Sequence, residues 1–449
     1  MPDENRKDGQ LAPASSPDKS PLWRRLGSKF WGPFLVACAL VLLFEALLDH
    51  MAESGELPGI TQSVFNVSFL YRQVVAAPRS PLPRYTAVVE INPKADASTP
   101  SMLHLCEQRG MTARLLRVIA QAFPRAIVLD KHYEPQPNPC PTDGEFMQAI
   151  RDLREANIPV IVGRRVAEET VVRNGEEQYY LRPSLEFWSP DPCPQGLSRS
   201  GQGCMEGVTS LSNDTRKVAL EWRVYEDEES AKSGHNLSWH DTLALSAARA
   251  YDPRLVEHHP RLVAFIERDE QPYVSFFSNK DIEAIPAGRL LSQPSLPAKC
   301  DKPLAVPVLS PDLRKLSGKV VLVGEINWDA DSHPSVVGKS PGLYLQANYI
   351  EALLDDRYFR PMPILDYVVG FLILLALELI LTLSGHGWIR ALLITALFVV
   401  SIGILYLFIK LPGWYVNPGA LGAVAIAIKL IQPLFGRAEK AAEAKGVGA

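Results

Sequence analysis

The chain has 449 residues, a formal net charge of −4 and a mean hydropathy near zero. This length admits two or three domains. The small net charge, without a long basic tract carrying interleaved aromatic residues, argues against nucleic acid as a partner. The mean hydropathy is misleading because strongly apolar segments are averaged with a larger part of ordinary soluble composition.

Four apolar segments of about twenty residues each predict four transmembrane helices, because such a helix crosses about 30 Å of hydrocarbon. They lie at 30–48, 363–383, 389–409 and 414–432. A cleaved signal peptide is the alternative for the first segment. That segment is long for a signal peptide, however, and no small-x-small cleavage site follows it in Glu45–Glu56. An uncleaved anchor is therefore favoured.

Basic residues beside these segments predict the orientation. Arg24, Arg25 and Lys29 immediately precede the first segment, which places the N-terminus in the cytoplasm. The large domain at 49–362 is then extracytoplasmic. The tail at 1–29, rich in Ser, Pro, Asp and Lys, is expected to be disordered. The second expected cytoplasmic tail is short and lies at 433–449.

Short apolar runs alternate with helical periodicity in the large domain. Continuous apolar strands separated by amphipathic helices predict an α/β fold, with a mostly parallel sheet covered by helices on both faces. The region 166–225 instead indicates hairpins and loops around that core. The expected strands are 85–91, 126–129, 159–163 and 319–324, and the expected helices are 112–123, 143–155, 241–251 and 342–354.

An extracytoplasmic domain permits disulfides. Cys193 and Cys204 bracket a loop rich in Pro, Gly and Ser, which a disulfide would stabilise. Cys106 and Cys140 each follow a predicted strand, in the next connection, which could bring them together. Cys300 is left over, either free or intermolecular. Buried thiols are the alternative, because sequence alone does not fix connectivity.

Polar residues stand at or just after the ends of predicted strands, where parallel α/β sheets place their ligand sites. Glu90, Asn92, Asp130 and Glu325 occupy such positions, and Asp143 begins a helix nearby. They predict a pocket for a small molecule or a cation, with carboxylates on its rim. The alternative is that Asp130 and Asp143 cap helices or turns.

The sequence carries no motif for a metal ion or a cofactor, so none is expected. No CxxC or paired His spacing indicates zinc. The strand Lys319–Gly324 is followed by Glu325 rather than by a Gly-rich phosphate-binding loop. Gly324 and Gly342 are attributed to backbone conformation.

Ionisable residues also fall in or near the apolar segments. Glu378 is the deepest, about fifteen residues into the second segment, and Glu45 lies within the first. Such groups cost about 2.5–3.5 kcal/mol on insertion scales and usually face the interior of a helical bundle. We expect Glu45 and Glu378 to couple helices or partners inside the membrane. Snorkelling towards water is the alternative, and it suffices for Asp366 and Lys429.

Several motifs resemble one family. Leu316–Gly324 (LSGKVVLVG) is followed by Pro341–Asn348 (PGLYLQAN), and Ala126–Asp130 (AIVLD) precedes Tyr133. These segments resemble the CHASE family, type two, an extracytoplasmic sensory domain associated with bacterial cyclases and histidine kinases. The resemblance implies an N-terminal anchor, an extracytoplasmic α/β domain and three further transmembrane helices. It therefore implies the bacterial inner (plasma) membrane, with the large domain in the periplasm.

Three features depart from the family pattern. The first strand ends in Ile91-Asn92-Pro93 instead of an Ile-Asp pair, and Cys106 replaces the usual Trp-Pro turn. No domain-sized segment follows the fourth apolar segment, where the family usually continues into a cyclase or a kinase. We therefore expect the output to come from a separate protein.

Three functions compete. The favoured one is a non-enzymatic membrane sensor that binds a ligand or an envelope partner and passes the signal through its helices to a separate effector. The resemblance implies that it works as a homodimer. A non-catalytic membrane scaffold, or subunit of an envelope complex, is the alternative. A periplasmic hydrolase using Asp130 or Glu325 is the third, and no Ser-His-Asp spacing or nucleophile elbow supports it.

Overall fold

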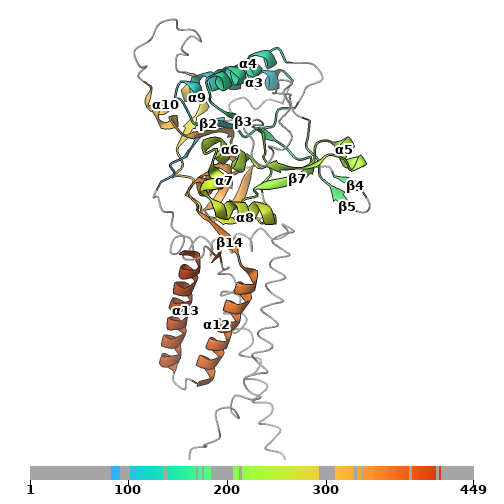
Figure 1. The fold of residues 1–449 in the computed structure, drawn as a ribbon. Helices are drawn as coiled ribbons and strands as arrows, with labels where there is room; N and C mark the ends of the chain where they lie inside the picture. The colour runs from blue at the N-terminus through green and yellow to red at the C-terminus, as the bar shows by residue number, and fades with distance from the viewer. Residues whose placement is uncertain are drawn as a thin grey trace, which may run out of the picture. The chain divides into compact units, whose positions relative to one another are not determined.

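The computed structural model describes most of the large domain and the second and third apolar segments (Figure 1). The described residues are 82–91, 102–134, 140–167, 170–173, 176–183, 206–211, 215–292, 309–327, 331–335, 337–383, 387–410 and 414–415.

Contacts divide these residues into two compact units. One unit holds positions 366–401, which belong to the helices α12 (Pro363–Leu383) and α13 (Gly387–Lys410). The other unit holds the described positions up to 365, together with 402–410 and 414–415. This second unit contains the α/β domain.

A parallel sheet of six strands forms the centre of the α/β domain, in the order β10-β1-β11-β2-β3-β6. Its four central strands are short and almost entirely buried, which explains their continuous apolar sequences. The strands are β1 (Thr86–Ile91), β2 (Ala126–Leu129), β3 (Val160–Arg164), β6 (Glu206–Val208), β10 (Ala284–Pro286) and β11 (Val320–Glu325).

Helices cover both faces of the sheet, and each face has its own apolar core. In Figure 1 one group of helices lies above the sheet and the other below it. One face packs against α3 (Met102–Ala120), α4 (Asp143–Glu155), α9 (Ala287–Leu291) and α10 (Pro311–Leu316). The other packs against α6 (Leu243–Tyr251), α7 (Leu255–His258), α8 (Pro260–Arg268) and α11 (Gly342–Leu354).

Shorter elements extend this core. Two antiparallel pairs and a short helix form the lateral part labelled β4, β5, β7 and α5 in Figure 1. Their bounds are β4 (Val171–Arg173), β5 (Glu176–Gln178), β7 (Glu221–Tyr225), α5 (Glu228–Ser233) and β8 (Leu237–Asp241). The remaining strands are β9 (Tyr273–Val274), β12 (Ser332–Ser335), β13 (Gly338–Pro341), β14 (Tyr358–Pro361) and β15 (Trp414–Tyr415).

The predicted α/β class is confirmed, and most predicted elements lie within two residues of the observed ones. The exception is α3, which begins at Met102 rather than at Thr112. The predicted start followed the apolar periodicity, which is weak in the first turns of this helix. The strand β6 joins the sheet from the region expected to be hairpins and loops.

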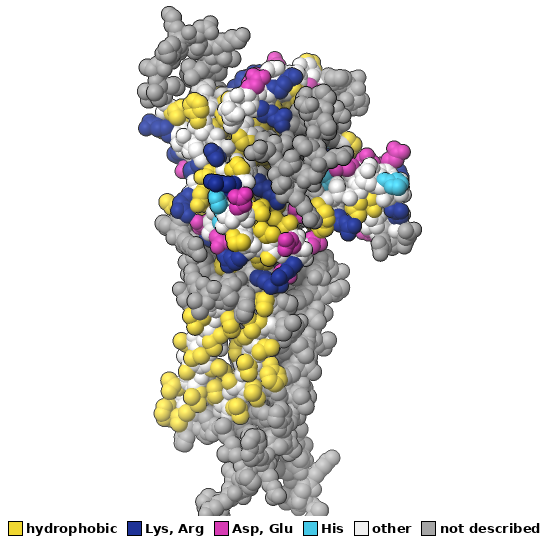
Figure 2. Space-filling view, in the orientation of Figure 1, with side chains coloured by type: hydrophobic (Ala, Val, Ile, Leu, Met, Phe, Trp, Pro, Cys, Tyr) yellow, Lys and Arg dark blue, Asp and Glu magenta, His cyan; other side chains and the backbone are white. Residues whose placement is uncertain are grey.

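α12 and α13 present apolar side chains outward, as Figure 2 shows. No helix in the described part of the chain combines the length and the hydropathy that a membrane crossing requires. The predicted segments at 30–48 and 414–432 lie outside the described residues, apart from Trp414 and Tyr415. Glu45 lies outside them as well, and the side chain of Glu378 in α12 is not described.

Candidate functional site

The carboxyl ends of five neighbouring strands form a row of two carboxylates and three glycines. The strand registers align these positions across five neighbouring strands, and their side chains face α6 and α11. β11 continues into α11 on this face, whereas its neighbours β1 and β2 continue into α3 and α4 on the other face. Such a change of direction marks the usual ligand-binding edge of an open α/β sheet. The row consists of Glu90, Gly324, Asp130, Gly163 and Gly207.

The glycines of this row are required by close packing. A Cβ atom on Gly324 would lie 3.0 Å from Leu343 Cδ1 and 3.3 Å from Asp130 Cβ. A Cβ atom on Gly207 would lie 2.5 Å from Leu243 Cα in α6. The attribution of Gly324 and Gly342 to backbone conformation was wrong, because neither has a positive φ angle; a Cβ on Gly342 would lie 3.2 Å from Asp331 Oδ2.

Asp130 occupies the centre of the row, directly after β2. Its backbone N–H donates to Val323 O at 2.9 Å. Burial raises the pKa of Asp130 to about 7, and the negative charge of Asp331 contributes further in the same direction. Among the described residues no donor to the Asp130 carboxyl is found, so this group is not a helix cap. Asp130 is therefore a partly buried acid whose raised pKa brings its ionisation near neutral pH.

α11 places three side chains against the row. Leu343 packs on Gly324, as described above, and the Tyr344 hydroxyl donates to Glu90 Oε1 at 2.6 Å. Burial and the Glu90 carboxylate raise the pKa of Tyr344. Gln346 is buried, and its Nε2 donates to Thr209 O at 3.3 Å, just beyond β6. The first turns of α11 thus contact both ends of the row.

Glu325 lies on the opposite face of the sheet. The Lys131 ammonium donates to Glu325 Oε1, and to Gln108 Oε1 in α3 at 2.6 Å. The alternation of side chains along a strand explains this separation, because Glu325 follows Gly324 directly. The prediction that Glu325 shares one pocket with Asp130 is not supported by this arrangement.

Asp143 is held by hydrogen bonds within the protein and does not line the row. Its Oδ1 accepts from Arg109 Nη1 at 2.6 Å, and its Oδ2 accepts from the Cys140 N–H at 3.0 Å. The Arg109 side chain is only 4% exposed, so the carboxylate balances a buried charge. Asp143 therefore holds the start of α4 against α3, away from the row.

The predicted pairing of Cys106 with Cys140 is confirmed, with a Cα–Cα distance of 5.3 Å. Cys106 lies inside α3 rather than in the connection before it. The Thr142 hydroxyl also donates to Cys106 O at 2.6 Å, which fixes the same junction of α3 and α4. Asn92, Cys193 and Cys204 lie outside the described residues.

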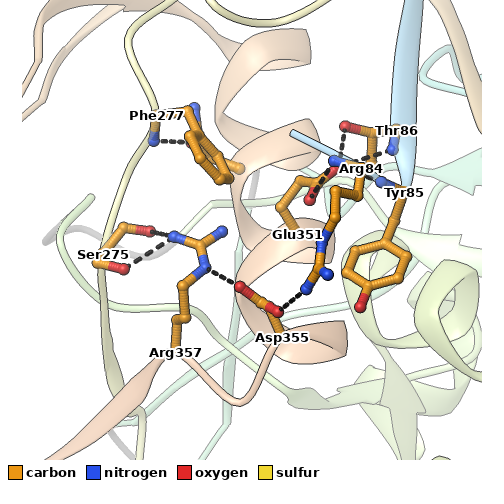
Figure 3. Close-up of polar contacts among 9 residues, drawn as sticks. Arg84, Tyr85, Thr86, Ser275, Phe277, Glu351, Asp355 and Arg357 are labelled. Atoms are coloured by element: carbon orange, nitrogen blue, oxygen red, sulfur yellow. Dashed lines mark hydrogen bonds and ion pairs between the residues drawn. The ribbon is translucent and has the colours of Figure 1, made fainter. Parts of the chain in front are cut away.

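A second cluster of charged side chains, which the sequence reasoning missed, surrounds the C-terminal half of α11 (Figure 3). From the described residues Glu351 accepts four hydrogen bonds. The backbone N–H groups of Arg84, Tyr85 and Thr86 donate at 3.2, 2.7 and 2.7 Å, and the Thr86 hydroxyl donates at 2.9 Å. Glu351 is 1% exposed. It therefore holds the start of β1 from the interior of α11.

The same cluster continues to the segment that leads into β14. Asp355 contacts Arg84 Nη2 at 2.5 Å and Arg357 Nε at 3.1 Å. The Arg357 guanidinium also donates from Nη1 to the Ser275 carbonyl and hydroxyl oxygens at 3.0 and 2.8 Å, and it lies 4.3 Å from the centre of the Phe277 ring. We call these groups, from Arg84 to Arg357, the Glu351 network. The sequence did contain one indication of this network: Glu351 is the single charged residue in the largely apolar run GLYLQANYIEALL.

All thirteen residues of α11 are buried, and the two clusters lie at its two ends. Asp331 lies at the N-terminal end, where the Gly342 N–H donates to its carbonyl oxygen at 3.3 Å. The Glu351 network lies at the other end, beside the start of β1 and the beginning of β14. In the described part of the chain, no group of three or more His, Cys, Asp and Glu side chains is arranged to hold a metal ion.

A search of curated proteins found no match, and neither did a search of solved structures. The sequence model of the CHASE2 domain matches residues 37–384, most of the 449-residue chain. The match covers the whole sheet, both clusters and α12. The chain therefore belongs to the CHASE2 domain family, whose domain is an extracytoplasmic sensory module, as the sequence motifs indicated.

Proposed function

We propose that this protein is a membrane-integral sensor whose α/β domain binds a stimulus at the carboxyl row and passes the signal through α11 to the helices that follow. The observation that carries the proposal is the position of α11. It contacts the carboxyl row with its first turns, and its last turns hold the two segments through which the chain enters β1 and proceeds to α12. A change at one end of a rigid buried helix is transmitted to the other.

Membrane integration is part of the proposal. The exposed apolar side chains of α12 and α13 support it, because soluble surfaces rarely carry such continuous apolar patches. Trp388 is 70% exposed, and Leu392 and Val399 are 63% and 62% exposed. The proposed location is the bacterial inner membrane, with the domain in the periplasm and both termini in the cytoplasm. The effector is a separate signalling protein, and a homodimer is the proposed signalling unit.

The proposal includes no catalytic step. Asp130 and Glu325 face opposite sides of the sheet, so they are not positioned to act together on one bond. Glu90 is engaged by Tyr344, and Asp143 is engaged by Arg109. The carboxylates predicted to line one ligand pocket are thus distributed over separate environments.

Quantitative affinity purification from native membranes tests the function. The full-length protein and its Glu351→Gln variant would be recovered in mild detergent from cells grown under several conditions, and the bound proteins measured by mass spectrometry. We expect a kinase, a cyclase or another signalling protein whose recovery changes with condition in the wild type. We expect this change to be lost in the variant.

Lys232→Ala is the matched control, because the contact that Lys232 makes in the described part of the chain is an exposed ion pair with Glu228 in α5. It should behave as the wild type does. Recovery of the same envelope proteins in every condition and in every variant would overturn the sensor proposal and support the scaffold instead.

A further inference from the structure

We propose that the lateral sheet is a docking surface for a second protein, whose contact surface is basic and carries apolar side chains among its charges. The lateral sheet consists of the pairs β4–β5 and β7–β8, which a bridge between Tyr180 and Tyr225 joins, together with α5 (Figure 1). This partner is additional to the stimulus that the proposed function places at the carboxyl row. Three observations carry the inference: the charge of the lateral sheet, its exposed apolar face, and its attachment to the central sheet.

The negative charge of the chain is concentrated in the lateral sheet. Positions 170–181 and 221–241 hold eight acidic and three basic residues, which is a formal net charge of −5. The whole chain carries −4, so all other positions together carry +1. Asp227, Glu228 and Glu229 are exposed in consecutive positions, and Figure 2 shows acidic side chains along this projecting part. Such a surface attracts a basic partner and repels an anionic membrane surface or a nucleic acid.

One face of the β4–β5 pair presents apolar side chains to water. Val172 lies opposite Glu177 in the strand register, so their side chains share this face, and the Tyr179 hydroxyl donates to Glu177 Oε2 at 3.4 Å. Val172 is 69% exposed and Tyr179 is 49% exposed. The described part of the α/β domain exposes five large apolar side chains, and three of them, these two and Leu237, belong to the lateral sheet. Apolar groups that gather in this way mark a site of protein contact.

The opposite face of the lateral sheet is closed by its own helix. Tyr180 and Tyr225 are buried there against Ala231 of α5. Because neighbouring side chains on a strand point to opposite faces, Tyr180 faces inward whereas Tyr179 faces water. Closing one face with α5 therefore leaves the other face, with Glu177 among its apolar groups, open to a partner.

Ion pairs fix the lateral sheet to the central sheet. Arg164, the last residue of β3, contacts Glu206 of β6 at 3.2 Å and Glu226, which follows β7, at 3.5 Å. Asp241, the last residue of β8, contacts Arg249 of α6 at 2.5 Å. A surface held in position before binding loses less conformational entropy when a partner arrives. The lateral sheet is therefore pre-organised for docking.

Site-specific photo-cross-linking of the full-length protein in its native membranes tests the inference. Tyr179→p-benzoylphenylalanine places the probe on the exposed face, and mass spectrometry identifies the cross-linked segment. We expect a protein other than this chain, joined through a segment in which Lys and Arg outnumber Asp and Glu. The yield should fall as the salt concentration rises from about 0.05 M to about 0.3 M, because salt screens exposed charges.

Charge variants in the same background distinguish a specific partner from a random neighbour. Glu177→Lys combined with Glu229→Lys should lower the cross-link yield about tenfold, because like charges then oppose docking. Glu107→Lys combined with Glu155→Lys makes the same change of charge on α3 and α4, and it should leave the yield unchanged. Val172→Ser should also lower the yield without changing the unfolding temperature, because this side chain is already exposed.

Phe123→p-benzoylphenylalanine is the probe control. Phe123 is an aromatic residue that is 70% exposed, and it lies before β2, at the opposite edge of the central sheet from the lateral sheet. It should not give the product obtained from position 179.

Four results would overturn the inference: no cross-link at Tyr179, a cross-link only to lipid or to a second copy of this chain, a yield that is insensitive to the charge of the lateral sheet, or the same product from Phe123. The proposed function does not depend on this outcome, since it stands or falls on whether effector recovery changes with condition.

Discussion

A carboxylate lies near each end of α11, Glu351 within the helix and Asp130 after β2, and their environments differ. Glu351, in the C-terminal half, accepts four hydrogen bonds from described residues at the start of β1. Asp130, directly after β2, receives no such hydrogen bonds from the described part of the chain, and burial and then the charge of Asp331 raise its pKa. A buried carboxylate surrounded by donors is a fixed structural element, whereas one without donors responds to pH. Glu351 therefore fixes the packing of its neighbours, whereas the ionisation of Asp130 is expected to depend on pH.

The largest expected loss of stability comes from the disulfide, which lies away from both ends of α11. It serves as a reference for the variants at those ends. Cys106→Ser should destabilise the domain by about 4 kcal/mol, because the disulfide closes a loop with a sequence separation of 34 residues. Urea unfolding under oxidising conditions measures the loss. The pH dependence of stability that the raised pKa of Asp130 predicts should be unchanged, because the disulfide lies on the α3 face. A shifted pH response would show that the two faces are coupled.

Glu351→Gln tests the holding end. The amide retains one acceptor but places a donor against N–H groups, so about 3 kcal/mol of stability should be lost. The free energy of unfolding in urea measures it. Glu228→Gln, in an exposed pair with Lys232, is the control and should change stability by no more than about 0.5 kcal/mol. Equal effects in the two variants would contradict the structural role of Glu351.

Asp130→Asn tests the carboxylate near the N-terminal end of α11. It should raise the free energy of unfolding, whereas Glu351→Gln should lower it. The raised pKa of Asp130 means that its ionisation destabilises the folded state, so wild-type stability should fall as pH rises from about 4 to about 7. The variant should be about 2 kcal/mol more stable than the wild type at pH 8, with little difference at pH 4. Thermal unfolding across this pH range provides the measurement. A variant that is less stable at pH 8 would refute the raised pKa.

Tyr344→Phe should have the smallest effect. The change removes the hydrogen bond between the Tyr344 hydroxyl and Glu90 but leaves the aromatic ring in place, so about 1 kcal/mol should be lost. Chemical denaturation at pH 5 and pH 8 should give the same loss, because Glu90 rather than Asp130 loses its partner. A loss confined to one pH would mean that Glu90 takes part in sensing.

Much of the fold was predictable from local pattern. The residues of β2, α4 and α11 were predicted with the observed bounds, because short apolar strands and amphipathic helices have distinct periods. The early start of α3 was missed because its first turns carry no strong apolar period. The position of β11 between β1 and β2 could not be predicted either, because the order of strands in a sheet depends on contacts between residues far apart in the chain.

The candidate site was predictable only in part. The rule that ligands approach the carboxyl ends of parallel strands led to Glu90 and Asp130, which do share one row. The same rule led to Glu325, one position beyond the row and therefore on the opposite face. It could not predict that Asp331 lies near the first residue of α11. Asp331 directly precedes β12, and the pairing of β12 with β13 places it there.

Local composition and periodicity in the sequence determined the α/β class and the apolar segments, and the motifs at Leu316–Gly324 and Pro341–Asn348 indicated the family. Only the tertiary structure decided which charges are held and which are poised to titrate. That distinction depends on donors contributed by distant segments, such as the N–H groups at 84–86 that surround Glu351, 265 to 267 positions away along the chain. The charge state of a buried acid is set by its neighbours in space, and those neighbours exist only after the chain has folded.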